Sequence, residues 1–225
     1  MSNRGNGTNP HRTFVLFTLF SVALVVFRIF YTSDQSYLYL IWNLFLAWVP
    51  LWISMLLHKY GSRKERSAIV FYSGVFVWLV FFPNAPYLVT DFIHFRQLDG
   101  GITAWYDLLM LMCFSLLGLL LGFYSLHLLR VLIRRRHGHF KASMFYYGSI
   151  LLCSAGIYLG RFQRWNSWDL LVRPMNVLSD ALSLEDSGMP QIAGFILITF
   201  FFLLFVYGVL SGLAGIRGGD GPYER

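Results

Sequence analysis

Six long apolar stretches alternate with short polar segments along this chain of 225 residues. A helix rises about 1.5 Å per residue and the hydrocarbon core of a bilayer is about 30 Å thick, so stretches of this length can cross it. Only 13% of the residues are charged, about half of what a water-soluble domain carries. We therefore predict an all-α polytopic membrane protein with six transmembrane helices. The predicted spans are residues 13–31, 37–57, 67–82, 104–129, 145–159 and 191–215.

The distribution of basic residues predicts the orientation of these spans. About 13 of the 18 Lys and Arg residues fall in the tails, 1–12 and 216–225, and in the loops after the second and fourth spans. Loops on the cytoplasmic side of a membrane carry an excess of Lys and Arg. Both termini are therefore expected in the cytoplasm, and the protein is expected in the cytoplasmic membrane. Residues 1–12 are expected to be a disordered tail. The first span lacks a small-residue cleavage site, so we expect it to be retained.

Composition also excludes several classes of protein. The net charge of +7 has no soluble basic domain to carry it, so nucleic acid is not an expected partner. Cys113 and Cys153 lie in apolar runs and are expected to be small buried hydrophobic residues. Phosphate-loop, dinucleotide-binding and zinc-protease motifs are missing from the sequence, so no cofactor is expected. The expected partners are membrane lipids, with a membrane-protein partner or a second copy of the chain as alternatives.

The third span meets a break at residues 82–87 (FPNAPY). Pro83 and Pro86 each lack an N–H, and each disfavours the helical conformation in the residue before it. The third helix should therefore end or kink at Phe82. Asn84 is expected to satisfy part of the backbone that the break leaves open.

Polar residues follow this break. If a helix resumes after Pro86, then Tyr87, Asp91 and His94 lie on one face. A carboxylate beside an imidazole suits proton exchange, so Asp91 and His94 are the candidate catalytic residues, and Asn84 and Tyr87 are candidates for substrate binding. Too few ligands are evident for a metal site. The simpler alternative is that Tyr87 anchors at the headgroups while Asp91 and His94 face water.

A second polar motif, residues 160–169 (GRFQRWNSWD), ends the fifth span. The planar guanidinium group of arginine suits phosphate or carboxylate, so the expected partners of Arg161 and Arg164 are a lipid headgroup, a lipid-linked phosphate or, alternatively, Asp91 and Asp107 of the same protein. Alternatively, Asn166 and Asp169 form a capping box for a short helix, and the two tryptophans belong to the interfacial belt. The candidate substrate-binding residues of this motif are Arg161, Arg164, Trp165, Asn166, Trp168 and Asp169.

Two further predictions concern the spans themselves. Asp107, about one turn into the fourth span, is a candidate site residue because charges in a bilayer are costly, and Arg161 or Arg164 is its expected counter-ion. Arg28 is expected to extend to the interface. In the sixth span, Gly208-x-x-x-Gly212 is a pattern that permits close helix contact.

The two motifs carry a resemblance to a known family. Residues 82–94 and 160–169 together resemble a bacterial family of small integral membrane proteins, the domain of unknown function 1361. The resemblance implies a polytopic bacterial membrane protein. It brings no established activity, substrate or catalytic residue with it.

Both motifs fall on the predicted extracytoplasmic side, which favours one shared polar site there. We expect this site to bind or process a lipid or a lipid-linked anionic substrate, with the arginines holding the anion and Asp91 and His94 exchanging the proton. A transporter that uses the broken third helix is one alternative. The other is a non-catalytic assembly protein whose motif residues lock the helices together.

Overall fold

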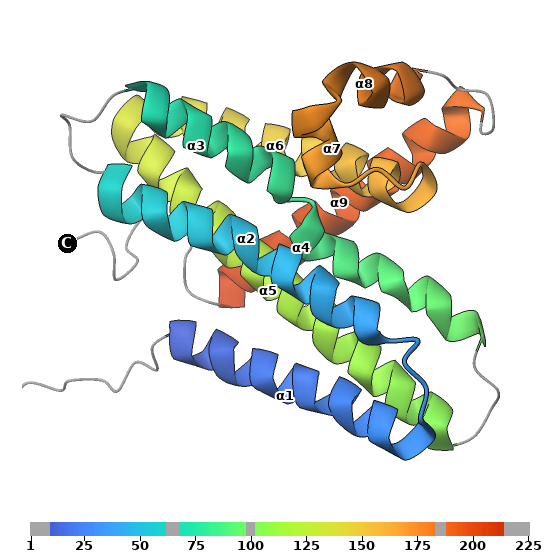
Figure 1. Cartoon of the computed structure of the whole chain (residues 1–225). Helices are drawn as coiled ribbons and strands as arrows, with labels where there is room; N and C mark the ends of the chain where they lie inside the picture. Colours follow the sequence, from blue (N-terminus) through green and yellow to red (C-terminus); the bar gives the residue numbers. More distant parts are fainter. Residues whose placement is uncertain (1–9, 62–67, 98–101, 183–187, 214–225) are drawn as a thin grey trace, which may run out of the picture.

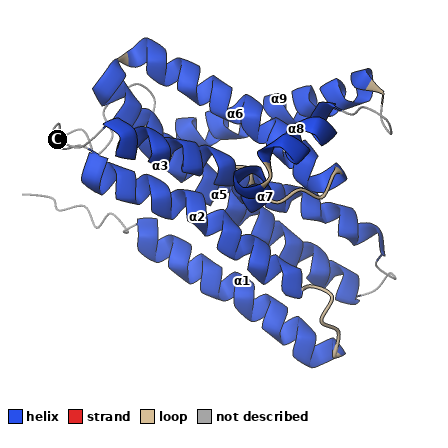
Figure 2. Ribbon diagram, turned by 45° about the horizontal axis from the view of Figure 1, so that its top comes forward, coloured by secondary structure: helices blue, strands red, loops and turns tan. Residues whose placement is uncertain are grey.

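The computed structural model describes residues 10–61, 68–97, 102–182 and 188–213, which form helices and short connections without a strand (Figures 1 and 2). The elements are α1 (Pro10–Thr32), α2 (Leu38–Gly61), α3 (Ala68–Phe81), α4 (Asn84–Tyr87), the 3-10 helix η1 (Leu88–Gln97), α5 (Ile102–His137), α6 (His139–Phe162), α7 (Ser167–Val172), α8 (Pro174–Leu182) and α9 (Met189–Leu213). Six stretches are long and apolar enough to cross a membrane: α1, α2, α5, α6, α9 and the combined stretch Ala68–Ile93. The predicted all-α class with six candidate spans is therefore confirmed. The C-terminal tail and most of the N-terminal tail lie outside the described residues.

Helix α5 is the centre of the bundle. It contacts α1, α2, α4, η1 and α6, while α9 packs against α6. Figure 1 shows α1 along one edge of the bundle and the short helices α7 and α8 beside the end of α3. The outer helices present large apolar side chains outward, such as Phe20 on α1 and Phe205 on α9, as contact with lipid requires.

The basic segment 130–141, which we expected to be a loop, is almost entirely helical. Helix α5 continues to His137 and α6 begins at His139, so Gly138 alone connects them. Gly138 has φ 85°, in the left-handed region that glycine adopts without steric cost. Arginine and lysine are good helix formers, and cations are favourable near a helix C-terminus, so the charges do not interrupt the helix.

The third span breaks at the two prolines, as predicted. Helix α3 ends at Phe81, and α4 begins at Asn84 after a two-residue turn. The Asn84 side-chain amide donates to the carbonyl of Phe81 at 2.9 Å, which is the predicted role. Further on, the Ser115 hydroxyl from α5 donates to the carbonyl of Leu88 at 2.9 Å. Side chains thus satisfy carbonyl groups that lipid could not solvate.

Four glycines let the broken segment approach its neighbours closely. On α5, a Cβ atom at Gly118 would overlap the carbonyl oxygen of Ala85, and one at Gly122 would lie 3.2 Å from the Ala85 Cβ. On α6, a Cβ at Gly156 would lie 2.6 Å from the Pro83 side chain. A Cβ at Gly160 would lie 3.2 Å from the Tyr87 ring. Each helix therefore uses a small-x-x-x-small pair to hold α4 against it.

The glycine pattern that we singled out in the sixth span does not serve this purpose. A Cβ at Gly208 would meet nothing within 4 Å. The pairs at 118/122 and 156/160 have the same spacing and lie in close contact with the broken segment. Spacing alone does not distinguish a glycine in contact from one that faces lipid.

We predict that Gly118→Ala destabilises the protein by about 1–3 kcal/mol, because the new methyl group meets backbone that cannot rotate away. The matched control Gly208→Ala should be neutral or stabilising by up to about 1 kcal/mol, since alanine favours a helix over glycine. Thermal unfolding of both purified variants, followed by tryptophan fluorescence, measures the difference. Equal midpoints for the two variants would contradict the close approach of α4 to α5.

Candidate functional site

The two motifs are joined by a buried ion pair. Arg161, at the end of α6, places Nη2 2.7 Å from the Asp91 Oδ1 in η1. Asp91 is only 1% exposed, and Asn43 of α2 donates to its other carboxylate oxygen at 3.2 Å. Arg161 also donates to the Thr90 hydroxyl, from Nε at 3.1 Å and from Nη2 at 2.7 Å. The alternative in which Asp91 faces water is therefore wrong.

Tyr87 lies under the same arginine. The Arg161 guanidinium carbon is 4.9 Å from the centre of the Tyr87 ring, within the range of a cation–π interaction. Gly160 leaves room for the ring on the α6 side. The ring position therefore depends on both Arg161 and Gly160.

A second link joins the motifs through α7. Asn84 donates to the Ser167 hydroxyl at 2.7 Å, in addition to its bond with Phe81. Asn166 and Asp169 form the expected capping box, in which the Asn166 backbone N–H donates to the Asp169 carboxylate at 2.8 Å. The amide of Asn84 thus ties the broken third span to the first turn of α7.

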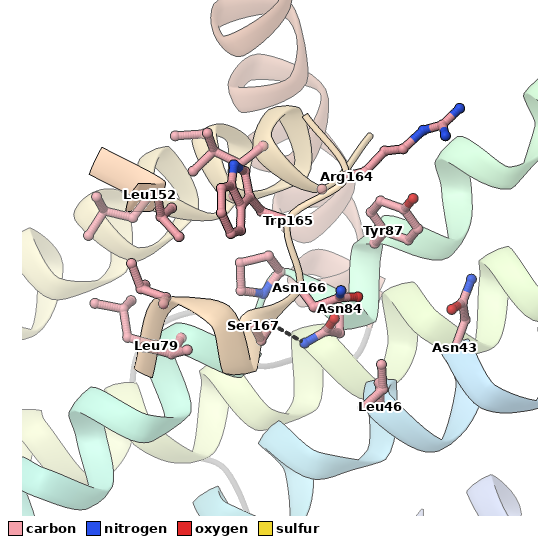
Figure 3. A pocket seen from close by; sticks show the side chains of 18 of the residues that line it. Asn43, Leu46, Leu79, Asn84, Tyr87, Leu152, Arg164, Trp165, Asn166 and Ser167 are labelled. Carbon is pink, nitrogen blue, oxygen red and sulfur yellow. Dashed lines mark hydrogen bonds between the residues drawn. The ribbon is translucent and has the colours of Figure 1, made fainter. Parts of the chain in front are cut away.

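A cavity of about 470 Å³ lies between the motifs, beside α2, α3, α6 and α7 (Figure 3). The polarity of its lining changes along the helices. Figure 3 shows Leu79 and Leu152 on one side, and Arg164 and Tyr87 on the other. A band of neutral polar side chains lies between these sides, formed by Asn84, Asn166 and Ser167. The cavity is therefore amphipathic, with its apolar part deeper in the candidate spans.

Arg164 is the cation of this cavity. Its side chain is exposed and extends away from Asn84 and Trp165 in Figure 3. Among the described residues it takes part in no ion pair. Its backbone adopts φ 57°, which is uncommon for a residue other than glycine, and the chain turns there so that the Trp165 N–H donates to the Leu159 carbonyl at 3.2 Å. This turn brings Trp165 onto the cavity wall.

Asp107 has a different counter-ion from the one we expected. Arg28 of α1 donates to it from Nε at 2.6 Å and from Nη2 at 3.1 Å. Asp107 is 0% exposed and Arg28 is 9% exposed, and Arg28 Nη2 also lies 3.9 Å from the carboxylate of Asp34 in the α1–α2 connection. Tyr37, between α1 and α2, lies 5.6 Å below the guanidinium, and burial, followed by the charge of Asp107, raises its pKa to about 12. Arg161 could not serve Asp107, because it is held by Asp91.

The predicted site residues fall into two groups. Five substrate-binding candidates line the cavity: Asn84, Tyr87, Arg164, Trp165 and Asn166. The remaining four are not part of the lining: Asp107, Arg161, Trp168 and Asp169. Of the catalytic candidates, Asp91 lies behind Tyr87 in the ion pair, and the side chain of His94 lies outside the described part of the structure. Within the described residues, no three His, Cys, Asp or Glu side chains are grouped as a metal site would require.

Several contributing residues were missed by the sequence argument. Asn43 on α2 holds Asp91, and Ser167 holds Asn84. Trp42, also on α2, lines the cavity and contacts the Trp168 ring edge-on at 6.4 Å between centroids. A polar Asn43 inside an apolar span was the available signal. The sequence carried no such signal for Ser167 or Trp42 beyond their position near an expected interface.

Comparison with known proteins gives one match. The model of the family described as "Protein of unknown function (DUF1361)" matches residues 42–206, which include both motifs and the whole cavity lining. The curated proteins and the solved structures compared with the chain give no match.

We predict that Arg161→Gln destabilises the protein by about 3–5 kcal/mol, because it leaves the Asp91 carboxylate buried without its partner. Adding Asp91→Asn to the same chain should restore much of this loss. Arg164→Gln, at an exposed position, should change stability by no more than about 0.5 kcal/mol. Thermal unfolding midpoints of the three variants and the wild type measure these effects. If Arg161→Gln is as stable as Arg164→Gln, Asp91 is not held as a buried charge.

Proposed function

The chain belongs to the DUF1361 family of proteins of unknown function, and we propose that it binds a membrane amphiphile with an anionic headgroup in the cavity between its two motifs. The observation that carries this proposal is the graded lining of the cavity. An amphiphile in a bilayer has the same order of polarity, with hydrocarbon deep and the charged group at the surface. A cavity whose lining changes in this order is complementary to such a molecule.

The apolar side of the cavity is continuous with the lipid-facing surface. Phe76 of α3 and Leu152 of α6 line the cavity and are each 55% exposed. Trp42 of α2, on the same lining, is 53% exposed. These walls support passage of a hydrocarbon chain from the bilayer into the cavity without crossing water.

Arg164 supports an anionic headgroup. The other arginine of the motif, Arg161, is neutralised by Asp91 and lies behind Tyr87. Arg164 is exposed, so its guanidinium group can form charge-assisted bonds with phosphate. The anion-binding role that we assigned to both arginines is therefore proposed for Arg164 alone.

Binding is a more direct proposal than turnover. Proton exchange by Asp91 would require its carboxylate to leave Arg161 and Asn43, at the cost of a partly buried arginine without its counter-ion. The pairing of Asp91 with His94 remains a prediction. A catalytic role for Asp91 and His94 would need a conformational change that separates η1 from α6.

A second candidate function has an observation of its own. The Asp91–Arg161 pair and the Asn84–Ser167 bond fasten the two motifs to each other, as a non-catalytic assembly protein would require. This alternative is tested by exchanging the two residues of an observed ion pair, either Asp91 with Arg161 or Asp107 with Arg28. Retention of full physiological function by such an exchanged protein would favour this second candidate.

We also propose that the motifs face the extracytoplasmic side, with both termini in the cytoplasm. The dense basic cluster at the α5–α6 connection supports this orientation. In a background carrying Cys113→Ser and Cys153→Ser, a membrane-impermeant maleimide applied to intact cells should label Ser36→Cys and leave Lys141→Cys unlabelled. Both positions are exposed, and they lie in the α1–α2 connection and near the α5–α6 connection. The reverse labelling pattern would overturn the proposed orientation.

For the binding itself, we predict that protein in neutral detergent takes up dioleoyl phosphatidic acid in preference to dioleoyl phosphatidylcholine. Arg164→Gln should weaken phosphatidic acid binding about fivefold, the upper range for an exposed charge pair. Ala155→Phe should abolish it by filling the cavity. Native mass spectrometry of the full chain counts the bound lipid.

The controls for this experiment lie next to the cavity without lining it. Arg173→Gln removes an exposed arginine at the end of α7, and Leu151→Phe adds bulk to the exposed face of α6. Both should bind as the wild type does. Equal loss in the controls and the cavity variants would show that the lipid binds elsewhere on the surface, and would reject the proposal.

A further inference from the structure

The geometry points to a specific ligand class for this cavity: a single-chain glycerophospholipid, in which a glycerol carrying a free hydroxyl joins the hydrocarbon to the phosphate. This inference rests on the proposed function and narrows it. It distinguishes a glycerol-based lipid from a phosphate attached directly to a long hydrocarbon. The residues that distinguish these two ligands are the neutral polar ones between the apolar and the charged sides of the cavity.

The neutral band is made of amides and a hydroxyl, and it lies between the leucines and Arg164. Asn84, Asn166 and Ser167 occupy the middle of the cavity in Figure 3. A hydrocarbon phosphate has no polar group between its chain and its anion, so it would cover the Asn84 Oδ1 and the Ser167 O–H without pairing them. Buried polar groups without a partner reduce binding. The ester and hydroxyl oxygens of an acylated glycerol fall at the position of the band.

The hydrogen-bonding capacity of the band favours a hydroxyl group on the ligand. The Asn84 nitrogen is identified by its bond to the Phe81 carbonyl, which can only accept. Its bonds to Phe81 and Ser167 both use this nitrogen, and its Oδ1 accepts from no described residue. Ser167 accepts from Asn84 and retains its own O–H to donate. One acceptor beside one donor suits a hydroxyl, whereas phosphate oxygens would be repelled by the Asn84 Oδ1.

The size and charge of the cavity agree with one chain and one anion. Its volume of about 470 Å³ lies in the lower half of the range of ligand pockets, which run to about 1,000 Å³. Asp91 and Arg161 neutralise each other outside the lining, so Arg164 is the only charged side chain that the described lining contains. A second acyl chain would have to remain in the bilayer.

Three probes with matched chemistry test this inference on the full-length protein in neutral detergent. Oleoyl lysophosphatidic acid has one chain, a free hydroxyl and a phosphate. Oleyl phosphate has the same chain length and phosphate without the glycerol, and dioleoyl phosphatidic acid has the glycerol without the free hydroxyl. Dissociation constants come from native mass spectrometry titrations. We expect the lysophospholipid to bind roughly tenfold more tightly than oleyl phosphate, as two added hydrogen bonds would allow.

Ser167→Ala should weaken binding of the lysophospholipid much more than binding of oleyl phosphate, and so remove most of this preference. A general loss of structure would weaken both ligands, so the ratio of the two constants isolates recognition of the glycerol. Ser73→Ala, on the exposed face of α3, is the matched control and should keep the wild-type ratio.

Each outcome has a defined meaning. Equal affinity for the lysophospholipid and oleyl phosphate would overturn recognition of the glycerol while leaving the anionic amphiphile intact. Tighter binding of dioleoyl phosphatidic acid than of the lysophospholipid would overturn the single-chain ligand. If none of the three probes binds, the proposed function itself fails.

Discussion

The close approach of residues 83–88 to α5 and α6 is the constraint on which the rest of this structure depends. A helix that stops inside a bilayer exposes carbonyl groups that lipid cannot solvate. Here the break is tolerated because Asn84 and Ser115 reach those carbonyls, and because Gly118 and Gly156 leave the space for α4 to lie against two helices at once. Without that approach, Asn84 would not reach Ser167, and the cavity would lose the wall that α4 provides.

Two buried ion pairs fix how the helices are placed around this break. Arg161 with Asp91 joins α6 to η1, and Arg28 with Asp107 joins α1 to α5. Pairs of this kind add little net stability, since desolvation offsets the attraction, but removing one partner is costly. They therefore act against alternative arrangements of the helices more than they stabilise this one. They also leave Arg164 as the cation that is available to a ligand at the cavity.

Much of the fold followed from local rules. The six apolar stretches, the end of α3 at the prolines and the capping box of α7 each depend on residues close together in the sequence. Pairings across the bundle did not follow, because nothing in a single sequence connects Arg28 with Asp107, 79 positions away. The glycines at 118 and 156 were hidden for a related reason: their spacing occurs by chance in apolar helices, and only the neighbour that each one meets distinguishes it.

The sequence predicted the location of the candidate site but not the contacts within it. Two apolar helices, α3 and α6, end in polar motifs, and it was correct to expect those motifs to meet. The sequence left two partners open for Arg161, a ligand anion or a carboxylate of the same protein, and only the structure shows that it pairs with Asp91. The remaining lining takes its order of polarity from the helices themselves. Leu79 and Leu152 precede the helix ends, while Asn84 and Arg164 follow them, so any ligand that fills the cavity must place its polar part where the two helices stop.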